Sequence, residues 1–510
     1  MSKLSHSLVM LALCLASNAS AGNLEAKQQG KTLRLRGDGA GVSFSLQGGG
    51  AALVEGRVRV AVGGTDTLNG QTRNLTFDGV SNVSVSFGGG ENLASLYSLL
   101  LTGSVDVRGG GLMVAGKVSA KSLSFDLTDD LLRMNCRFGG DVQLALGDGN
   151  NDVRIEDEGM MQPRARSLSM KLGGGDDQVV FVGGRVDKDI KIDLGGGSNE
   201  CWIADSNTSG SVTLKGGSGH DRVDVDTFFA SRNMKLALGG GANSMTVVEA
   251  TIQKGIVAEA GGGDDVVRLD DVNLPEGLTL KLGNGDNSLE LKKVVGGRKF
   301  AYSGGSGSDV IVGENVGMGG DWSIRAAGSE ARNAFVMSQG AISGSVSVTG
   351  GAGDELVSLQ AVEIFGGTRI AGRLDVSSGA GDDMVDCGSD GEPQMGSTRS
   401  TSARVRIESS GSAGKFRSVS RRRCWPRRRW QFTAGRSCAR GRSRHGPSSA
   451  SPSAQRSSAC SRAGTGAGTR ARTPRRARSP TSSRATRGRR TQSPARTGLS
   501  RSCSRCRRRE

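Results

Sequence analysis

The sequence predicts an all-β fold: a parallel β-solenoid (β-helix or β-roll type) of about 22 residues per coil, with a disordered C-terminal tail. A glycine turn recurs at a fixed interval, strand-type alternation flanks each turn, and the composition changes near residue 396. A fixed period in this range is typical of stacked repeats, in which each unit buries its apolar side against its neighbours. The first glycines of seven successive turns, 22 residues apart, are Gly173, Gly195, Gly217, Gly239, Gly261, Gly283 and Gly305.

Residues 1–21 are predicted to be a signal peptide. Lys3 precedes an apolar run from Leu8 to Ala16, and Ala19-Ser20-Ala21 provides a small-residue cleavage site. The run is too short to cross a bilayer, and no other run approaches that length, so no membrane span is predicted. We therefore expect an exported protein, located outside the cell or on its surface, with the periplasm as the alternative.

Residues 22–140 are predicted to be divergent repeats that cap the N-terminal end of the solenoid. Alternating segments such as 42–46 and 83–87 lead into glycine runs, but the spacing of these runs is irregular. Irregular terminal repeats are typical of capping units, which must end a stack. Within this region, Leu93–Leu101 is predicted to form a short helix or a capping segment.

Residues 141–395 are predicted to form the regular solenoid. Apolar residues alternate before each turn, as in Ile190, Ile192 and Leu194, and again after it, as in Cys201 and Ile203. Period-two alternation indicates strands with one buried face, so each unit contains a strand, a glycine corner, a second strand and a second bend. We expect Leu194, Leu238 and Leu282 to face inward. An antiparallel meander remains the alternative, because strand–turn–strand is also the pattern of a hairpin.

The residue that closes each glycine turn alternates between an amide and an acid. The series is Asn151, Asp177, Asn199, Asp221, Asn243, Asp265, Asn287, Asp309, Asn333 and Glu355. Leucine precedes the glycines of Asn-closed turns, whereas Gly216, Ala260, Gly304 and Gly350 precede those of acid-closed turns, with Leu172 as the exception. Equivalent residues of adjacent coils stand about 4.8 Å apart, so an unbroken carboxylate row would repel itself. Interleaved amides widen the charge spacing and add hydrogen bonds along the stack.

Residues 396–510 form a basic segment of different composition. They hold 31 Arg and one Lys against two Glu, a charge of +30, whereas the chain as a whole carries +17 and residues 1–395 carry −13. Few apolar residues and dense like charge predict disorder. One explanation is an Arg/Ser-rich arm for anionic partners. The other, which we favour, is a GC-rich gene read out of frame: if the third bases of the codons for 463–469 are G, the shifted frame reads Gly and Asp codons.

The turns resemble the nonapeptide Gly-Gly-x-Gly-x-Asp-x-(large apolar)-x of RTX, or haemolysin-type, calcium-binding repeats. Segments 304–312 and 216–224 match it fully, although the present blocks recur every 22 residues and not in tandem. The resemblance implies a β-roll, export, and Ca²⁺ as the metal. The calcium ligands it implies are Asp177, Asp221, Asp265, Asp309 and Asp383. On the residues alone, Asp and Asn close such turns by bonding backbone amides, without any metal.

Signals for catalysis are sparse, so the sequence leans against an enzyme and predicts no catalytic residues. His220 is the one histidine of the repeat body and occupies a variable turn position, which indicates a solvated turn residue. Cys201 takes an inward strand position and is expected to be a buried hydrophobe. We therefore expect an exported structural or adhesive protein that calcium stabilises, with cell-surface polysaccharide or matrix as partner and no nucleic acid on the repeat body. The alternative is a carbohydrate-active β-helix enzyme or polysaccharide-binding protein, recognisable by an outer cleft with clustered carboxylates and Arg.

Overall fold

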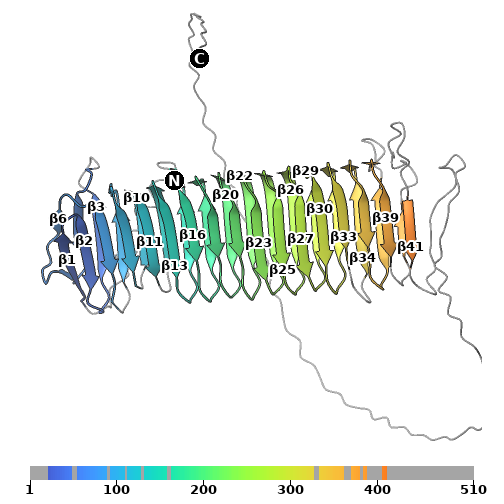
Figure 1. Ribbon diagram of the computed structural model, residues 1–510. Helices are drawn as coiled ribbons and strands as arrows, with labels where there is room; N and C mark the ends of the chain where they lie inside the picture. Colours follow the sequence, from blue (N-terminus) through green and yellow to red (C-terminus); the bar gives the residue numbers. More distant parts are fainter. Residues whose placement is uncertain are drawn as a thin grey trace, which may run out of the picture. The chain divides into compact units, whose positions relative to one another are not determined.

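The computed structural model describes residues 21–48, 54–88, 92–109, 112–127, 131–157, 162–326, 332–360, 369–378, 383–386 and 405–409. Over these residues the fold is all β, and the strands wind coil after coil along one axis (Figure 1). The predicted parallel β-solenoid is therefore confirmed. No helix in the described ranges has the length and apolar character that crossing a membrane requires.

One side of the solenoid is sheet A, whose strands end at the glycine corners in the regular part. In the order of their pairing its strands are β5 (Thr67–Leu68), β1 (Asn23–Gln29), β2 (Thr32–Gly37), β7 (Asn82–Ser86), β9 (Ser104–Arg108), β11 (Ser122–Leu127), β13 (Asp141–Leu146), β16 (Ser167–Lys171), β19 (Ile190–Asp193), β21 (Val212–Lys215), β23 (Met234–Gly239), β25 (Ile256–Ala260), β27 (Leu278–Gly283), β30 (Lys299–Gly304), β33 (Asp321–Arg325), β36 (Val346–Thr349), β39 (Leu374–Ser378) and β41 (Val405–Ser409).

The other side is sheet B, whose strands follow the corners. They are β6 (Leu75–Phe77), β4 (Val58–Val62), β3 (Ser43–Gly48), β8 (Leu93–Tyr97), β10 (Leu112–Ala120), β12 (Leu131–Phe138), β14 (Asp152–Glu156), β17 (Gln178–Val182), β20 (Glu200–Thr208), β22 (Arg222–Ala230), β24 (Ser244–Ile252), β26 (Val266–Leu274), β28 (Ser288–Lys292), β31 (Val310–Glu314), β34 (Asn333–Ser338), β37 (Glu355–Gln360) and β40 (Met384–Asp386). In some coils a separate short strand follows the sheet B strand. These short strands are β15 (Arg164–Ala165), β18 (Arg185–Val186), β29 (Val295–Gly296), β32 (Gly317–Met318), β35 (Ala341–Ile342) and β38 (Arg369–Ile370).

Strand pairing in the regular part is parallel with an offset of 22 residues. Cys201 pairs with Val223, Val223 with Met245 and Met245 with Val267. The offset widens towards the C-terminal coils, to 24 residues between Ile311 and Phe335. These registers exclude an antiparallel meander for the regular units, because a meander would pair each strand with the strand that precedes it in sequence.

The core lies between the two sheets and runs the length of the stack. Leu194, Leu238 and Leu282 are almost completely buried, which confirms the predicted inward face, and Cys201 is buried beside them. The buried Trp322 contacts Phe300 and Phe335, with ring centroids 4.4 and 6.1 Å apart. Because every coil adds its own apolar layer, the core grows with repeat number and not with diameter.

The N-terminal end departs from the parallel rule. β1 pairs antiparallel with β2, and β4 pairs antiparallel with both β3 and β6. The prediction of a short helix at Leu93–Leu101 is wrong: Leu93–Tyr97 is strand β8, parallel to β3 and β10. Ala94 and Leu96 are buried in alternation, so their period is two, and a period of two suits a strand.

A backbone kink lies within strands β20, β22, β24 and β26 and directly after β28. The kink residues Asp205, Thr227, Glu249, Asp271 and Lys293 all have φ between 46° and 56°, in the left-handed region. The same position in the preceding coil is Gly183, whose φ is 70°. Left-handed backbone turns the chain from sheet B towards the second bend and sheet A.

The two ends of the chain lie mostly outside the described residues. These include residues 1–20 of the predicted signal peptide and nearly all of the predicted tail. Strand β41 is an addition to the prediction, because it lies within 396–510 and pairs with β39 from Leu374 to Ser378.

Candidate functional site: the polar ladder at the glycine corners

The residues that close the glycine turns form one buried polar ladder along the solenoid. Each sits immediately before a sheet B strand and points inward. Exposure is 2 % or less for Asn151, Asp177, Asn199, Asp221, Asn243, Asp265, Asn287 and Asp309, and Asn333, Glu355 and Asp383 are also buried. All five sequence-predicted site residues therefore belong to this ladder: Asp177, Asp221, Asp265, Asp309 and Asp383.

Adjacent steps of the ladder are joined by side-chain hydrogen bonds. The backbone N–H of Asp221 donates to Oδ1 of Asn243 at 3.0 Å. In the next step, the N–H and Nδ2 of Asn243 both donate to Oδ1 of Asp265, at 2.9 and 3.0 Å. The same pair of steps recurs from Asp177 to Asn199 and from Asn287 to Asp309. The expectation that Asp and Asn bind backbone amides is therefore confirmed, although the amide belongs to the preceding coil.

Asparagine also ties its own corner together. Nδ2 of Asn243 donates to the carbonyl of Gly241 at 2.9 Å, and Nδ2 of Asn287 donates to that of Gly285 at 3.1 Å. An amide supplies both an acceptor and two donors, whereas an ionised carboxylate supplies acceptors alone. The Asn-closed coils thus satisfy both the preceding coil and their own turn.

The acid-closed coils leave one oxygen without a partner. Oδ2 of Asp177, Asp221, Asp265 and Asp309 is buried and makes no hydrogen bond within the described residues. In two of these coils it lies against the glycine that replaces the leucine of Asn-closed coils. A Cβ on Gly304 would stand 1.7 Å from Oδ2 of Asp309, and a Cβ on Gly216 would stand 1.9 Å from Oδ2 of Asp221. In these two coils the glycine leaves the space that the second oxygen occupies, whereas Leu172 accompanies Asp177.

Burial changes the acidity of these carboxyl groups. Desolvation raises the pKa of Asp177, Asp221, Asp265 and Asp309, against the opposing effect of the hydrogen bonds from the neighbouring asparagines. Charges on the outer turn act on three of them: Asp176, Asp264 and Asp286 raise the pKa of Asp177, Asp265 and Asp309 respectively. The charge of His220 lowers the pKa of Asp221, and the hydroxyl group of Tyr302 lowers the pKa of Asp309.

The ladder ends in two acids in succession. The backbone N–H of Glu355 donates to Oδ1 of Asp383 at 3.1 Å, with no asparagine between them. Desolvation, together with this neighbouring carboxyl, raises the pKa of Glu355. Next to it, Asp309, Asn333 and Glu355 line a small cavity, where the repeat offset has widened to 24 residues.

A second, exposed row of side chains runs parallel to the ladder, one residue earlier in each turn. Oδ1 of Asp176 accepts the N–H of Ser198 at 2.7 Å, and Oδ1 of Asp264 accepts that of Asp286 at 2.7 Å. His220, predicted to be a solvated turn residue, is exposed and its Nδ1 accepts the N–H of Ala242 at 3.0 Å. The sequence signal for this row was the same 22-residue period, displaced by one position.

The donor set of the ladder does not match the calcium site that the resemblance implies. Ca²⁺ takes six to eight oxygen ligands. From Asp177 to Asp309 each ladder carboxylate has asparagine in both adjacent coils, so the next one lies two coils away, about 9.6 Å. In addition, Oδ1 of Asp265 and of Asp309 already accepts two hydrogen bonds from the asparagine of the preceding coil. Nowhere in the described ranges do three or more Asp, Glu, His or Cys side chains converge as a metal site.

Comparison of the chain with protein-family models, with curated proteins and with solved structures gives no match in any of the three.

Proposed function

We propose that the chain is an exported structural or adhesive solenoid. The supporting observation is the repetition of the outer surface. Parallel pairing at a constant offset places equivalent outward side chains one above another, at about 4.8 Å per coil. A surface that repeats in this way offers many equivalent contacts to a partner, and several weak contacts then add up to firm attachment.

The proposal is tested by locating the full chain and measuring its attachment. Expressed in a bacterial host, it should lose residues 1–21, which mass spectrometry of the N-terminus would detect, and it should be found outside the cytoplasm. The purified chain should then be retained on surfaces coated with cell-surface polysaccharide or matrix. Cytoplasmic protein with Met1–Ala21 intact would contradict export, and no retention on any coated surface would contradict adhesion.

Calcium stabilisation is a separate part of the prediction and has its own experiment. A ligand that binds only the folded state raises the melting midpoint by mass action. Melting curves of the full chain in millimolar Ca²⁺ and in chelator, with Asp265→Asn and Asp309→Asn beside the parent chain, distinguish the two roles. If the acids close the turns, as their hydrogen bonds favour, the midpoint is the same in both solutions. A rise in Ca²⁺ that both substitutions reduce would restore calcium as the role of the ladder.

One observation favours polysaccharide as the partner. Trp202 on β20 is 46 % exposed on the outward face of sheet B, although large aromatic side chains usually bury most of their surface. Sugar rings stack on such flat aromatic faces, and Arg222 and Asp224 of the next coil provide polar groups beside it. Trp202→Ala should therefore weaken retention on polysaccharide without changing the melting midpoint. Unchanged retention would exclude this face.

A further inference from the structure

The two sides of the solenoid carry opposite charge between residues 188 and 299. Sheet A and the bend that leads into it carry nine basic residues and four acidic ones. Sheet B and its kink carry eight acidic residues and four basic ones. The basic set is Lys188, Lys191, Lys215, Arg232, Lys235, Lys254, Lys281, Arg298 and Lys299, and the acidic set is Glu200, Asp205, Asp224, Asp226, Glu249, Asp270, Asp271 and Glu290.

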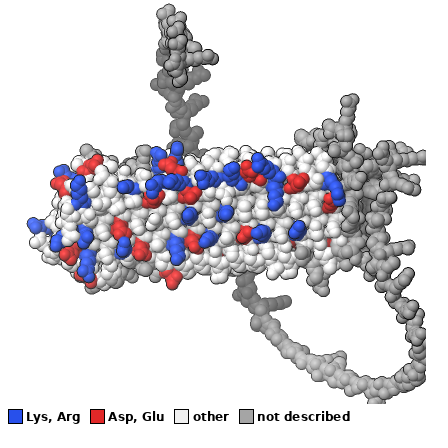
Figure 2. Space-filling model, viewed as in Figure 1, with Lys and Arg blue, Asp and Glu red and all other residues white. Residues whose placement is uncertain are grey.

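Six of the nine cations on the basic side take part in no ion pair within the described residues, whereas Lys254 and Arg298 pair with Glu276 and Lys281 pairs with Glu259. Figure 2 shows Lys and Arg in a row along one edge of the face viewed, with Asp and Glu among them, and further side chains of both kinds over the strands below. Lys171, Lys191, Lys215 and Lys235 are exposed, and none of them is in an ion pair within the described ranges. Charges that lack a partner on their own surface are available to another surface.

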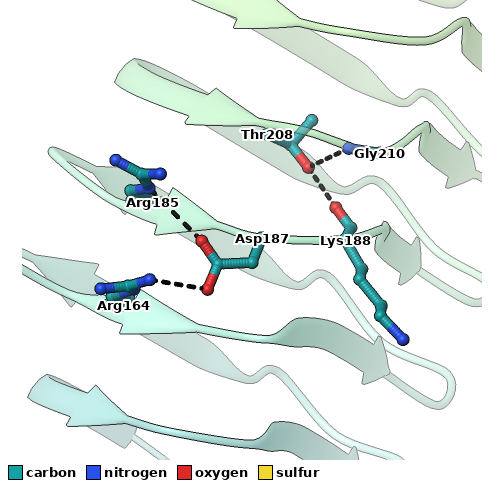
Figure 3. Close-up of polar contacts among 6 residues, drawn as sticks. All are labelled: Arg164, Arg185, Asp187, Lys188, Thr208 and Gly210. Carbon is teal, nitrogen blue, oxygen red and sulfur yellow. Dashed lines mark hydrogen bonds and ion pairs between the residues drawn. The ribbon is translucent and has the colours of Figure 1, made fainter. Parts of the chain in front are cut away.

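The bend shows the difference between paired and unpaired cations at close range (Figure 3). Asp187 binds Arg164 at 3.0 Å and Arg185 at 3.3 Å, so its carboxylate is already engaged. Lys188, the next residue, extends its side chain away from this group. Its backbone carbonyl accepts the hydroxyl of Thr208, which fixes the bend while leaving the ammonium group exposed.

Most acids of the acidic side are also unpaired, and only Asp224 and Glu290 of the set form ion pairs among the described residues, with Arg222 and Arg268 respectively. Asp205, Asp226, Glu249, Asp270 and Asp271 take part in no ion pair among the described residues. Asp205, Asp226, Glu249 and Asp271 are exposed, and Asp270 is half-buried. These five side chains come from four consecutive coils, so the acidic side is continuous over the stretch in which the opposite side is basic.

Both sides also repeat at the same interval. Lys191 and Lys235 are 44 residues apart, as are Asp226 and Asp270, so each pair is separated by two coils. Two coils correspond to about 9.6 Å along the axis. Since both intervals arise from one backbone, a basic side laid against an acidic side of a second copy would keep its charges in register over several coils.

We propose that the basic side of one solenoid binds the acidic side of a second copy of this chain. The interface is heterologous, since it joins two different surfaces, and each added copy presents a free basic or acidic side for the next. The inference deepens the proposed structural role and rests on it. A single exposed ion pair contributes little and is screened by salt, so the association depends on repetition along the axis.

Charge reversal of each side, in the full chain, tests the proposal by sedimentation velocity. The first variant, Lys191→Glu/Lys235→Glu, lowers the net charge of the basic side from +5 to +1, and the second, Asp226→Lys/Asp270→Lys, raises that of the acidic side from −4 to 0. At low ionic strength the parent chain should grow into larger species as concentration rises, and about 1 M NaCl should disperse them. Each variant alone should associate at least tenfold more weakly, and an equimolar mixture of the two should recover association.

Controls separate this interface from folding and from the basic tail. Lys27→Glu/Arg34→Glu makes the same change of net charge on the outward side of β1 and β2, and it should associate like the parent. All variants should melt like the parent, because every substituted side chain except Asp270 is exposed. Should Asp270→Lys prevent folding, Asp226→Lys/Glu249→Lys replaces it.

Three outcomes would overturn the proposal. A parent chain that stays monomeric at low salt contradicts it directly. Undiminished association of the first variant would show that another basic segment, such as 396–510, binds the acidic side. A mixture that fails to associate would show that the two sides do not recognise each other. Retention on coated surfaces is measured separately, so these results leave adhesion untouched.

Discussion

Acid-closed and asparagine-closed coils share one repeat pattern but differ in how they satisfy the corner. In the coil closed by Asn243, the amide serves both its own turn and the next coil, and Leu238 fills the space beneath. In the coil closed by Asp309, one oxygen takes that space and Gly304 replaces the leucine. The first glycine differs as well: Gly195, Gly239 and Gly283, which open the turns closed by Asn199, Asn243 and Asn287, have φ between 75° and 77°.

The two coil types therefore differ in three linked features: the residue that closes the turn, the residue that precedes its glycines, and the backbone conformation of the first glycine. A single substitution breaks the match, whereas a paired substitution converts one coil type into the other. The physical cost differs among these changes, because steric overlap, lost hydrogen bonds and an uncompensated charge have different magnitudes.

The largest effect is expected from Gly304→Leu. Its Cβ would lie 1.7 Å from Oδ2 of Asp309, so the carboxylate must move out of its buried position. We expect a loss of about 3 kcal/mol, the upper part of the range for overpacking. Adding Asp309→Asn should recover much of this loss, because it recreates the pairing of Leu282 with Asn287. Denaturant unfolding of the single and double variants measures the recovery, and additive losses would refute the pairing.

A smaller effect is expected from Asn243→Asp, which creates three successive ladder acids with Asp221 and Asp265. The change removes the Nδ2 donor to Gly241 and to Asp265 and brings carboxylates about 4.8 Å apart. We expect a loss of about 2 kcal/mol at neutral pH. The loss should diminish on acidification, when the carboxyl groups become neutral. A loss that stays constant from pH 7 to pH 4 would point to packing instead.

Asp265→Asn should change stability in the opposite direction. The pKa of Asp265 is raised in the folded chain by desolvation, so its contribution is fully present below the ordinary value of 3.8 and is lost as pH rises through the folded value. At pH 7 the variant should exceed the parent by about 1 kcal/mol. The difference should vanish towards pH 4. Comparison of the two chains is required, because Asp141, whose pKa Arg166 and Ser167 lower to about 2, responds to acid in the opposite sense.

The smallest effect is expected at the kink, which is common to both coil types. Thr227 is β-branched and has φ of 46°, whereas Gly183 occupies the same place in an earlier coil. Thr227→Gly relieves left-handed strain of about 1–2 kcal/mol but costs about 0.5–1 kcal/mol of chain entropy. A net gain below about 1 kcal/mol should appear as a slightly higher melting midpoint. A lower midpoint would show that Thr227 is held by other contacts.

Much of the architecture could be predicted because the repeat is local. Period-two alternation specifies which side chains point inward, and it correctly placed Leu194, Leu238 and Leu282. The same rule is less clear for Leu93–Tyr97, because the apolar Leu93 occupies an outward position while Ala94 and Leu96 are the buried residues.

The candidate site was predicted in position but not in environment. The sequence showed that acids and amides alternate at the corners, and that small residues accompany the acids. It could not show that these side chains point inward, nor that Oδ1 of each acid accepts from the preceding coil. The exposed turn acids and the buried ladder acids both recur every 22 residues, so the spacing alone does not distinguish them.

The sequence by itself determined the repeat length, the strand–corner–strand unit and the inward positions, because each depends on residues only a few places apart. Only the tertiary structure decided that the strands pair in parallel across 22 residues, that the first strands reverse direction, and that opposite charges gather on opposite sides. The hydrogen-bond partner of a strand depends on which other strand the stacking of the coils places beside it. Alternation specifies the face of a side chain but leaves its neighbour across the sheet open.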